Sequence, residues 1–176
     1  YFLKALKAGE TLKNNFLKAS IYNNIANVYA DLKNYQVALD YYQKYLAASV
    51  SIKSQVNEIR ALSNIADVHV ELNDFSTGLD YYQRALSIAD EAGSKEISAA
   101  IYNNIGETFL KQKDYALAYN YYTKSLQLSN ESMNIETKTN SLNGLAEICL
   151  DRQQYTKAEA YSKLSLHFAK QINDIS

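Results

Sequence analysis

The apolar residues of this chain recur at the spacing of an α-helix. The first set follows the pattern i, i+3, i+4, i+7, which places side chains along one stripe of a helix, and consists of Tyr22, Ile25, Ala26 and Tyr29. A second stripe follows after a break too short for anything but a tight turn, and it consists of Tyr35, Ala38, Leu39, Tyr42 and Leu46. The pattern predicts two antiparallel helices, named helix A and helix B below.

This helix pair is repeated along the chain. The segment 22–26 recurs at 62–66, 102–106 and 142–146, so that each copy is shifted by 40 positions. A Tyr-Tyr pair in helix B follows the same shift, at 41–42, 81–82 and 121–122. We therefore expect a single array over 1–176, with the second helix of an earlier repeat at 1–13 and four repeats at 14–53, 54–93, 94–133 and 134–173. Because the pattern is already running at Tyr1, we expect the chain to be part of a longer protein.

Small residues mark where helices A and B must touch, because a side chain no larger than a methyl group lets two backbones approach closely. They are Ala26, Ala66, Gly106 and Ala146 on helix A, and Ala38, Gly78, Ala118 and Ala158 on helix B. A bulky residue at any of these positions is expected to overpack the interface, at a cost of roughly 1 to 3 kcal/mol. Neither helix pair can bury its stripe alone, so neighbouring repeats must stack.

Polar residues recur in the predicted turns as well. One set precedes each helix B and the other precedes each helix A, and the two sets are Asn34, Asp74, Asp114 and Gln154, and Asn14, Ser54, Ser94 and Asn134. Asn, Asp and Ser side chains accept hydrogen bonds from the exposed amides of a helix start, which predicts N-caps. Gly93 can end one helix by adopting a positive φ.

These features together resemble the tetratricopeptide repeat family. The small residues, the Tyr-Tyr pair and an aromatic residue at the start of each helix B recur in register over the whole chain, the last being Tyr35, Phe75, Tyr115 and Tyr155. The family's proline after helix B and tryptophan in helix A are missing, and the period exceeds its usual length of about 34 residues. The longer period is similar to that of kinesin light chains and of bacterial peptide-responsive regulators or sensor proteins. The resemblance implies an all-α fold, a right-handed superhelical solenoid of antiparallel helix pairs with a concave groove.

The composition narrows the possible partners. A formal net charge of -1 provides no obvious attraction to phosphate, so we expect this fragment to bind no nucleic acid. No apolar run approaches the roughly 20 residues of a membrane helix, so we expect no membrane contact by this fragment. The lone cysteine, Cys149, suits a reducing cytoplasm but also a periplasmic domain, and the compartment stays open, with the periplasm expected if the array belongs to a membrane sensor.

A polar face of helix A lies roughly opposite the apolar stripe. In the family this face lines the concave groove and contacts the ligand, so the resemblance implies a peptide-binding site there. Its residues are Asn23, Asn24, Asn27, Asp31, Arg60, Ser63, Asn64, Asp67, Glu71, Asn103, Asn104, Glu107, Lys111, Asn143, Glu147 and Asp151.

Two features of this face suggest how a partner is held. Asn24, Asn64 and Asn104 form a ladder whose amides can pair with the backbone of an extended peptide, and Gly144 interrupts it. The alternative is that these asparagines are hydrated or bond a neighbouring helix. The acidic residues of the face outnumber its cations, Lys111 and Arg60, which favours a basic partner unless nearby lysines balance a solvated surface.

Other candidate sites are weaker. Most of the 16 tyrosines occupy stripe positions, which favours packing over a ligand surface. His69, Cys149 and His167 lack the neighbours of a metal site, so we expect neither metal nor cofactor. Asn130-Glu131-Ser132 fits a glycosylation motif that often arises by chance. No nucleophile with a base, carboxylate pair in a cleft or phosphate-binding glycine loop is recognisable, so we do not expect an enzyme.

Three hypotheses for the function follow. The first is a binding module that holds an extended or helical protein segment in the groove. The second is a ligand-sensing or regulatory region of a bacterial signalling protein, a histidine kinase or a transcriptional regulator, because the segment 169–174 and the Lys, Asn, Ile and Tyr richness resemble arrays before such output domains. The third is a passive scaffold, in which exposed end faces permit end-to-end self-association.

Overall fold

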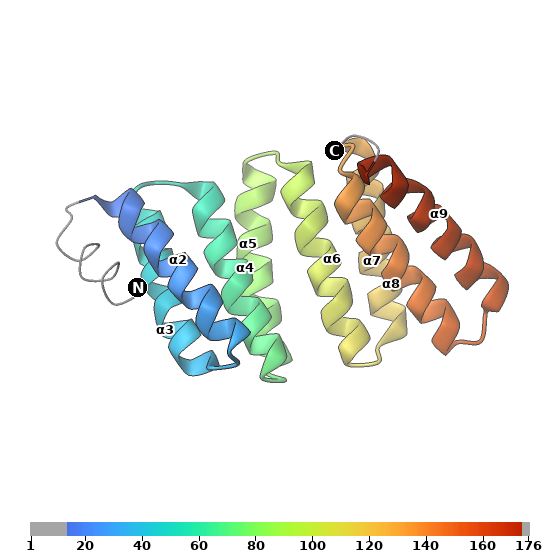
Figure 1. Cartoon of the computed structure of the whole chain (residues 1–176), viewed down its shortest axis with the longest axis horizontal. Helices are drawn as coiled ribbons and strands as arrows, with labels where there is room; N and C mark the ends of the chain where they lie inside the picture. The colour runs from blue at the N-terminus through green and yellow to red at the C-terminus, as the bar shows by residue number, and fades with distance from the viewer. Residues whose placement is uncertain (1–13, 174–176) are drawn as a thin grey trace. The chain divides into compact units, whose positions relative to one another are not determined.

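The structure, a computed structural model, describes residues 14–173, with the side chains of residues 14–171. The helix expected at 1–13 and the end of the segment 169–174 lie outside this range. Helices and turns account for all of the described residues, which confirms the all-α prediction. The helices are α2 (Asn15–Asp31), α3 (Tyr35–Ser51), α4 (Gln55–Glu71), α5 (Phe75–Glu91), α6 (Lys95–Lys111), α7 (Tyr115–Glu131), α8 (Ile135–Asp151) and α9 (Tyr155–Asn173) (Figure 1). Whether the repeats are bounded at 14, 54, 94 and 134 stays a prediction.

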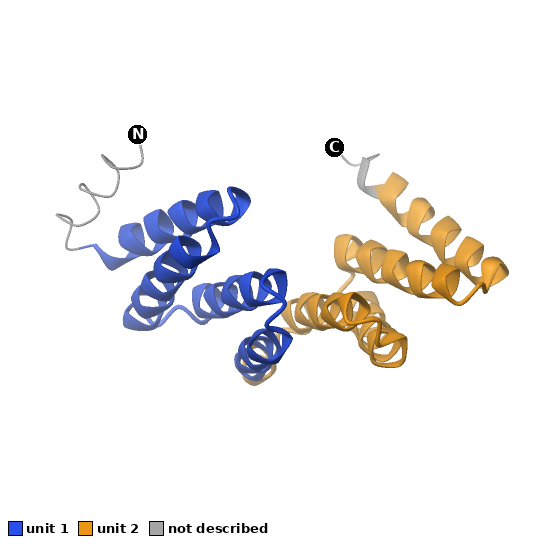
Figure 2. Ribbon diagram, turned by 90° about the horizontal axis from the view of Figure 1, so that it is seen from below, with its two compact units in different colours: residues 1–88 blue, residues 89–176 orange. Residues whose placement is uncertain are grey.

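The chain divides into two compact units, residues 1–88 and 89–176 (Figure 2). In the first unit α2 packs against α3, and α3 packs against α4. In the second unit α6 packs against α7, α7 against α8, and α8 against α9, while α6 and α8 also touch directly. Each A helix is thus antiparallel to the B helix that follows it.

The core of each unit forms where small residues meet large rings. In the first unit Ala26 and Ala38 have no exposed surface and lie in one cluster with Tyr42 and Tyr45. In the second unit the cluster consists of Ala118, Tyr122, Leu145 and Ile148. The predicted small positions are all buried, which confirms that they let the helices approach.

Only part of the predicted capping is present. The side chains of Asn14, Ser54, Asp74, Asp114 and Asn134 accept hydrogen bonds from amides of the first helical turn. Asn34 and Ser94 were predicted wrongly, since their side chains make no such bond. Their backbone carbonyls accept from the amides of Ala38 and Ser98 instead, at 3.0 Å in both cases, so the main chain alone begins these helices.

A left-handed residue stands in every turn. Gly93 has φ +65°, as predicted, and six other residues have φ between 54° and 62°: Lys33, Lys53, Asn73, Lys113, Met133 and Gln153. This conformation lets the next amides bond back to the last helical carbonyls, as when Asn34 N–H donates to the Tyr29 carbonyl at 2.8 Å. A left-handed backbone costs a residue with a Cβ roughly 1–2 kcal/mol, so these turns are fixed by the helices they join rather than by their own sequence.

The absence of a side chain at Gly144 is explained by the ring of Tyr122, which lies against it. A Cβ on Gly144 would lie 2.3 Å from the tyrosine ring, and one on Gly106 would lie 3.0 Å from it. The ring of the buried Tyr122 therefore passes between two helices at positions where both lack a side chain. Gly144 stands where the repeat would place an asparagine of the ladder, and a side chain at this position would overlap the ring of Tyr122.

We expect Gly144→Ala to lower the free energy of unfolding by about 1–3 kcal/mol, because the added methyl group overlaps the Tyr122 ring. Urea unfolding followed by circular dichroism measures this loss. In a Tyr122→Leu background the same substitution should cost clearly less, since the overlapping atoms are gone. An equal cost in both backgrounds would show that the contact is not the reason for the glycine.

Candidate functional site

In the first unit the polar face of helix A is tied to the next helix by hydrogen bonds. The Tyr42 hydroxyl donates to Asn27 Oδ1 at 2.8 Å, and the Tyr82 hydroxyl donates to Asp67. Asn64 Nδ2 donates to Asn23 Oδ1 at 3.2 Å, so this asparagine pair joins α4 to α2. Part of the ladder thus bonds a neighbouring helix, which is the alternative that the sequence left open.

Four of the predicted residues gather in a cavity of the first unit. It has a volume of about 370 Å³ and lies beside the buried Tyr42. The predicted residues in its wall are Asp31, Asn64, Asp67 and Glu71. Carboxylates from two successive A helices therefore face the same space.

The second unit brings more of them together. A cavity of about 570 Å³ between α6 and α8 is lined by Asn103, Asn104, Glu107, Lys111, Asn143 and Glu147, all of them predicted. Tyr122 and Gly144 lie in the same wall. Amide and charged side chains therefore predominate in this wall.

Two of the asparagine amides in this cavity lie within hydrogen-bond distance of serine hydroxyls. The Ser165 hydroxyl donates to Asn143 Oδ1 at 2.6 Å. The single hydrogen of the Ser141 hydroxyl is shared among three acceptors, Ser125 Oγ at 2.8 Å, the Thr137 carbonyl at 2.9 Å and Asn103 Oδ1 at 3.1 Å. Ser141 and Ser165 are both buried. The Ser165 bond orients the amide of Asn143, while Ser141 lies within hydrogen-bond reach of the amide of Asn103.

The structure adds residues that the sequence analysis missed. Asn140 lines both the larger cavity and a neighbouring one of about 330 Å³, together with Asn103 and Asn104. In the smaller cavity Asn134 Nδ2 donates to Glu96 Oε1 at 2.9 Å. The sequence could have indicated Asn140 as a site residue, because it occupies the same repeat position as Arg60, which was predicted.

The remaining predicted residues lie outside these cavities. Asn24 is exposed and Ser63 is half-buried. Arg60 lies near the buried phenol of Tyr45, where its charge offsets part of the rise in the Tyr45 pKa that burial causes. Asp151 Oδ2 accepts from the Tyr115 hydroxyl at 2.7 Å, which holds the end of α8 against the start of α7.

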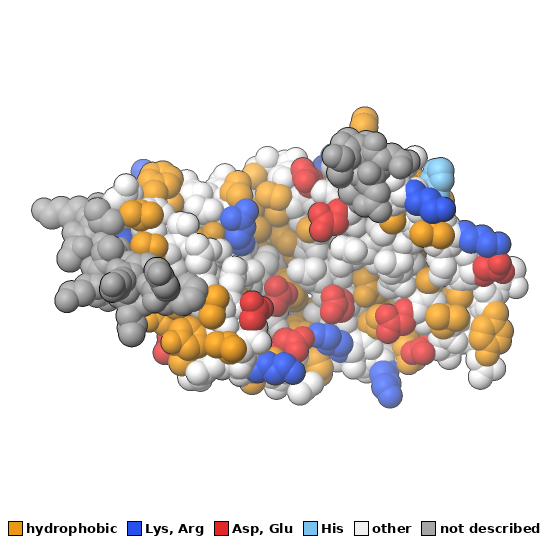
Figure 3. Space-filling model, viewed as in Figure 1, with side chains coloured by type: hydrophobic (Ala, Val, Ile, Leu, Met, Phe, Trp, Pro, Cys, Tyr) orange, Lys and Arg blue, Asp and Glu red, His pale blue; other side chains and the backbone are white. Residues whose placement is uncertain are grey.

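Carboxylates dominate the electrostatics of the A-helix face. Asp and Glu side chains gather over α4 in the first unit and over α6 and α8 in the second (Figure 3). Burial, together with Asp67 and Asp31, raises the pKa of Tyr42 to about 12, and burial with Glu107 and Glu147 raises the pKa of Tyr122 as well. Lys111 Nζ lies 3.8 Å from Glu107 Oε1, so the one lysine predicted for this face is paired.

The other candidates are part of the packing. Tyr42, Tyr45, Tyr82 and Tyr122 are buried, which confirms a core role for these tyrosines. His69 Nδ1 lies 3.1 Å from Asp74 Oδ2.

Within residues 14–173 no group of His, Cys, Asp and Glu side chains is placed to hold a metal ion. No helix of this range combines the length and the apolar character needed to cross a membrane.

Comparison with known proteins gives one family and several solved structures. The family described as "Tetratricopeptide repeat" matches residues 17–91 and 97–171. The chain is similar to aspartyl phosphate phosphatase F from Bacillus subtilis, at 18% identity and a TM-score of 0.90, over 99% of this chain and 46% of that one. It is also similar to a Rap protein complexed with Competence and Sporulation Factor, at 19% identity and a TM-score of 0.83, over 94% of this chain and 46% of that one.

A third likeness is to the apo form of the quorum sensor NprR from B. thuringiensis, at 25% identity and a TM-score of 0.72, over 87% of this chain and 43% of that one. The chain spans less than half the length of these three proteins. No curated protein matches the sequence. The likenesses confirm the predicted helical-repeat fold.

The phenol of Tyr42 predicts a pH dependence of stability. Because its pKa rises from 10.0 to about 12 on folding, its contribution is fully present below pH 10 and is lost as the pH rises through 12. Between pH 9 and 11 we expect the wild type to lose about 1 kcal/mol more stability than Tyr42→Phe, measured by urea unfolding at both values. Equal losses would show that the Tyr42 phenol ionises as readily in the folded state as in the unfolded state.

Proposed function

Since the chain belongs to the tetratricopeptide repeat family, we propose that it is a binding module, which holds an extended or helical segment of a protein partner along the polar face of its A helices. The single observation that carries this proposal is the cavity between α6 and α8. Four asparagines and two carboxylates line it, from two successive A helices: Asn103, Asn104, Asn140, Asn143, Glu107 and Glu147.

Asparagine amides suit a peptide backbone, because each offers a donor and an acceptor like the peptide group itself. Asn143 uses its oxygen to accept from the buried Ser165, which leaves its amide hydrogens for a ligand. Asn104 and Asn140 line both the cavity between α6 and α8 and its smaller neighbour, so they lie along the path that an extended segment would follow. Amides fixed before binding lose little entropy when the partner arrives.

The charge of this face supports a partner segment that is basic or rich in donors. Glu107, Glu147 and Tyr122 line the same cavity, and after burial both carboxylates raise the pKa of the Tyr122 phenol, so their charges act on the same small region. A lysine or arginine in the bound segment would offset them, whereas an acidic segment would be repelled.

A regulatory region of a bacterial signalling protein is the second candidate. It draws support from the solved structures that this chain resembles, one of them named as a quorum sensor and another as a complex with Competence and Sporulation Factor. A membrane segment and kinase module beyond the chain would favour a sensor, and a DNA-binding module would favour a transcriptional regulator. A passive scaffold that self-associates end to end is the third candidate, and finding neither kind of module in the full-length protein would favour it.

The charge proposal predicts a preference between two peptides. An extended lysine–threonine peptide should bind more tightly than its glutamate–threonine counterpart, and its affinity should fall as sodium chloride screens the carboxylates. Fluorescence anisotropy of labelled peptides at low and high salt measures both effects. A tighter complex with the acidic peptide, or affinity that does not respond to salt, would contradict the proposal.

The asparagine proposal predicts a loss of affinity without a loss of fold. Removing two amides by Asn104→Ala with Asn140→Ala should weaken binding of the lysine–threonine peptide about tenfold, at about 1 kcal/mol or less for each hydrogen bond. Asn120→Ala is the matched control, because Asn120 is exposed on α7 and lines neither cavity. Thermal melts should be alike for all three proteins. Unchanged affinity in the double variant would refute a role for these amides.

A further inference from the structure

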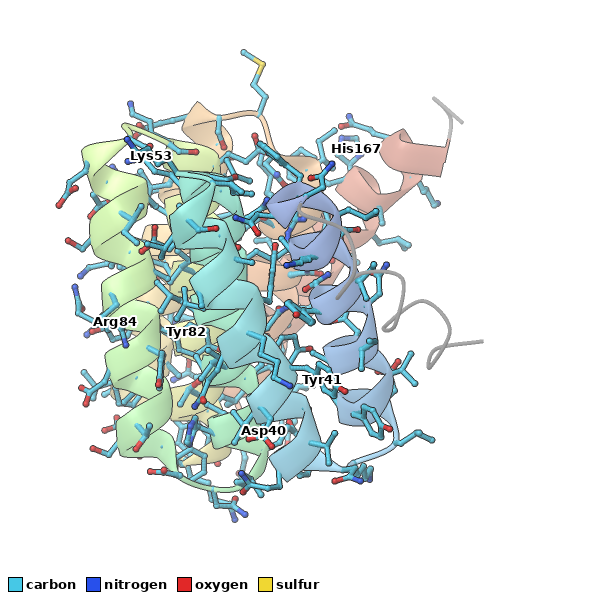
Figure 4. All side chains as sticks on the ribbon, turned by 90° about the vertical axis from the view of Figure 1, so that its left-hand side faces the viewer. Asp40, Tyr41, Lys53, Tyr82, Arg84 and His167 are labelled. Atoms are coloured by element: carbon cyan, nitrogen blue, oxygen red, sulfur yellow. The ribbon has the colours of Figure 1, made fainter. Side chains whose placement is uncertain are left out.

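One aromatic stack is incomplete in the last repeat. In the other repeats a ring from helix A stacks on a tyrosine of helix B: Tyr29 on Tyr41 at 6.1 Å between centroids, His69 on Tyr81 at 5.7 Å, and Phe109 on Tyr121 at 5.4 Å. Their planes are parallel within 13°. Figure 4 shows the first of these tyrosines, Tyr41, between α3 and α2. At the same repeat positions the last repeat has Tyr161 and Cys149, whose thiol is far smaller than a ring, and both residues line one cavity.

A cavity occupies the place of the missing ring. Its volume is about 570 Å³, and Cys149 and Tyr161 line it together with Ile148, Tyr119, Arg152 and Lys157. This size falls within the roughly 300–1,000 Å³ typical of small-molecule sites. The cavity lies among α7, α8 and α9 and shares no lining residue with the cavities of the A-helix face.

The lining favours an anionic ligand. Arg152 and Lys157 contribute two cations, and no carboxylate lines the cavity. Within residues 14–173 neither cation forms an ion pair, although the Arg152 guanidinium lies 5.7 Å from the centre of the Tyr115 ring. A bound acid would therefore gain two charge-assisted contacts without breaking an existing pair.

A helix pair packed after α9 would leave this cavity open to solvent. The positions equivalent to Lys157 and Ala160 in the preceding repeat are Leu117 and Asn120. Leu117 is 38% exposed and Asn120 is exposed, even though α8 and α9 pack beyond them. This side of helix B thus faces solvent in the interior of the array as well.

We propose that this cavity binds a small aromatic acid. The ring of the ligand stacks on Tyr161, in the position that Tyr29, His69 and Phe109 fill in the other repeats. Its carboxylate points toward Arg152 and Lys157. Stacking gives selectivity for an aromatic ring, and the two cations give selectivity for an acid.

Three related compounds test the proposal in solution. Phenylacetate carries both features, cyclohexylacetate lacks the aromatic ring, and 2-phenylethanol lacks the charge. In nitrogen-15 chemical-shift titrations of the whole chain, phenylacetate should shift the amides of Cys149, Gln154 and Tyr161 and bind about fivefold more tightly than either control. Equal affinities for phenylacetate and cyclohexylacetate would overturn the stacking role of Tyr161.

Substitutions at Cys149 locate the site. Cys149→Phe restores the ring of the other repeats and should abolish phenylacetate binding, whereas Cys149→Ala leaves the space open and should retain it. Lys157→Gln should weaken phenylacetate but not 2-phenylethanol. If Cys149→Phe does not fold, Tyr161→Leu replaces it, with an expected loss of about fivefold. Undiminished binding by Cys149→Phe or by Tyr161→Leu would refute the proposal.

Discussion

The contact between a buried tyrosine ring and a backbone without a side chain controls both the packing and the polar face of this protein. Tyr122 occupies the space left by Gly106 and Gly144, and its hydroxyl ends beside Glu107 and Glu147. Tyr42 and Tyr82 likewise pass through the core of the first unit and bond Asn27 and Asp67. The rings thus hold the helices at their spacing, while the hydroxyls of Tyr42 and Tyr82 fix residues of the polar face, so the core and this face cannot vary independently.

The sequence predicts the regular part of this arrangement. Apolar spacing and small residues suffice for the helices and for the face on which Asn103, Asn104 and Glu147 meet, because both follow from helical geometry alone. Hydrogen bonds across the groove were not predictable in this way. Whether Asn64 bonds Asn23 or stays hydrated depends on the distance between α2 and α4, which no pattern within one helix contains.

Departures from the repeat carry information of a different kind. At Gly144 a missing asparagine makes room for a ring of the same unit, so the change is compensated. At Cys149 a missing ring leaves a cavity, and no larger side chain fills it. In the sequence both residues are simply exceptions to the repeat. Only the neighbouring side chains show that the space at Gly144 is filled by Tyr122, whereas the space at Cys149 stays open.

The turns have a consequence for how such a chain changes in length. Every joint places a left-handed residue at the same point between helices, and residues as different as Lys33, Gly93 and Met133 occupy that point. A deletion or duplication of one whole helix pair would therefore reconnect two joints of the same geometry. Genetic recombination can lengthen or shorten this array by whole helix pairs, and the number of polar positions along the A-helix face can evolve separately from the chemistry of each one.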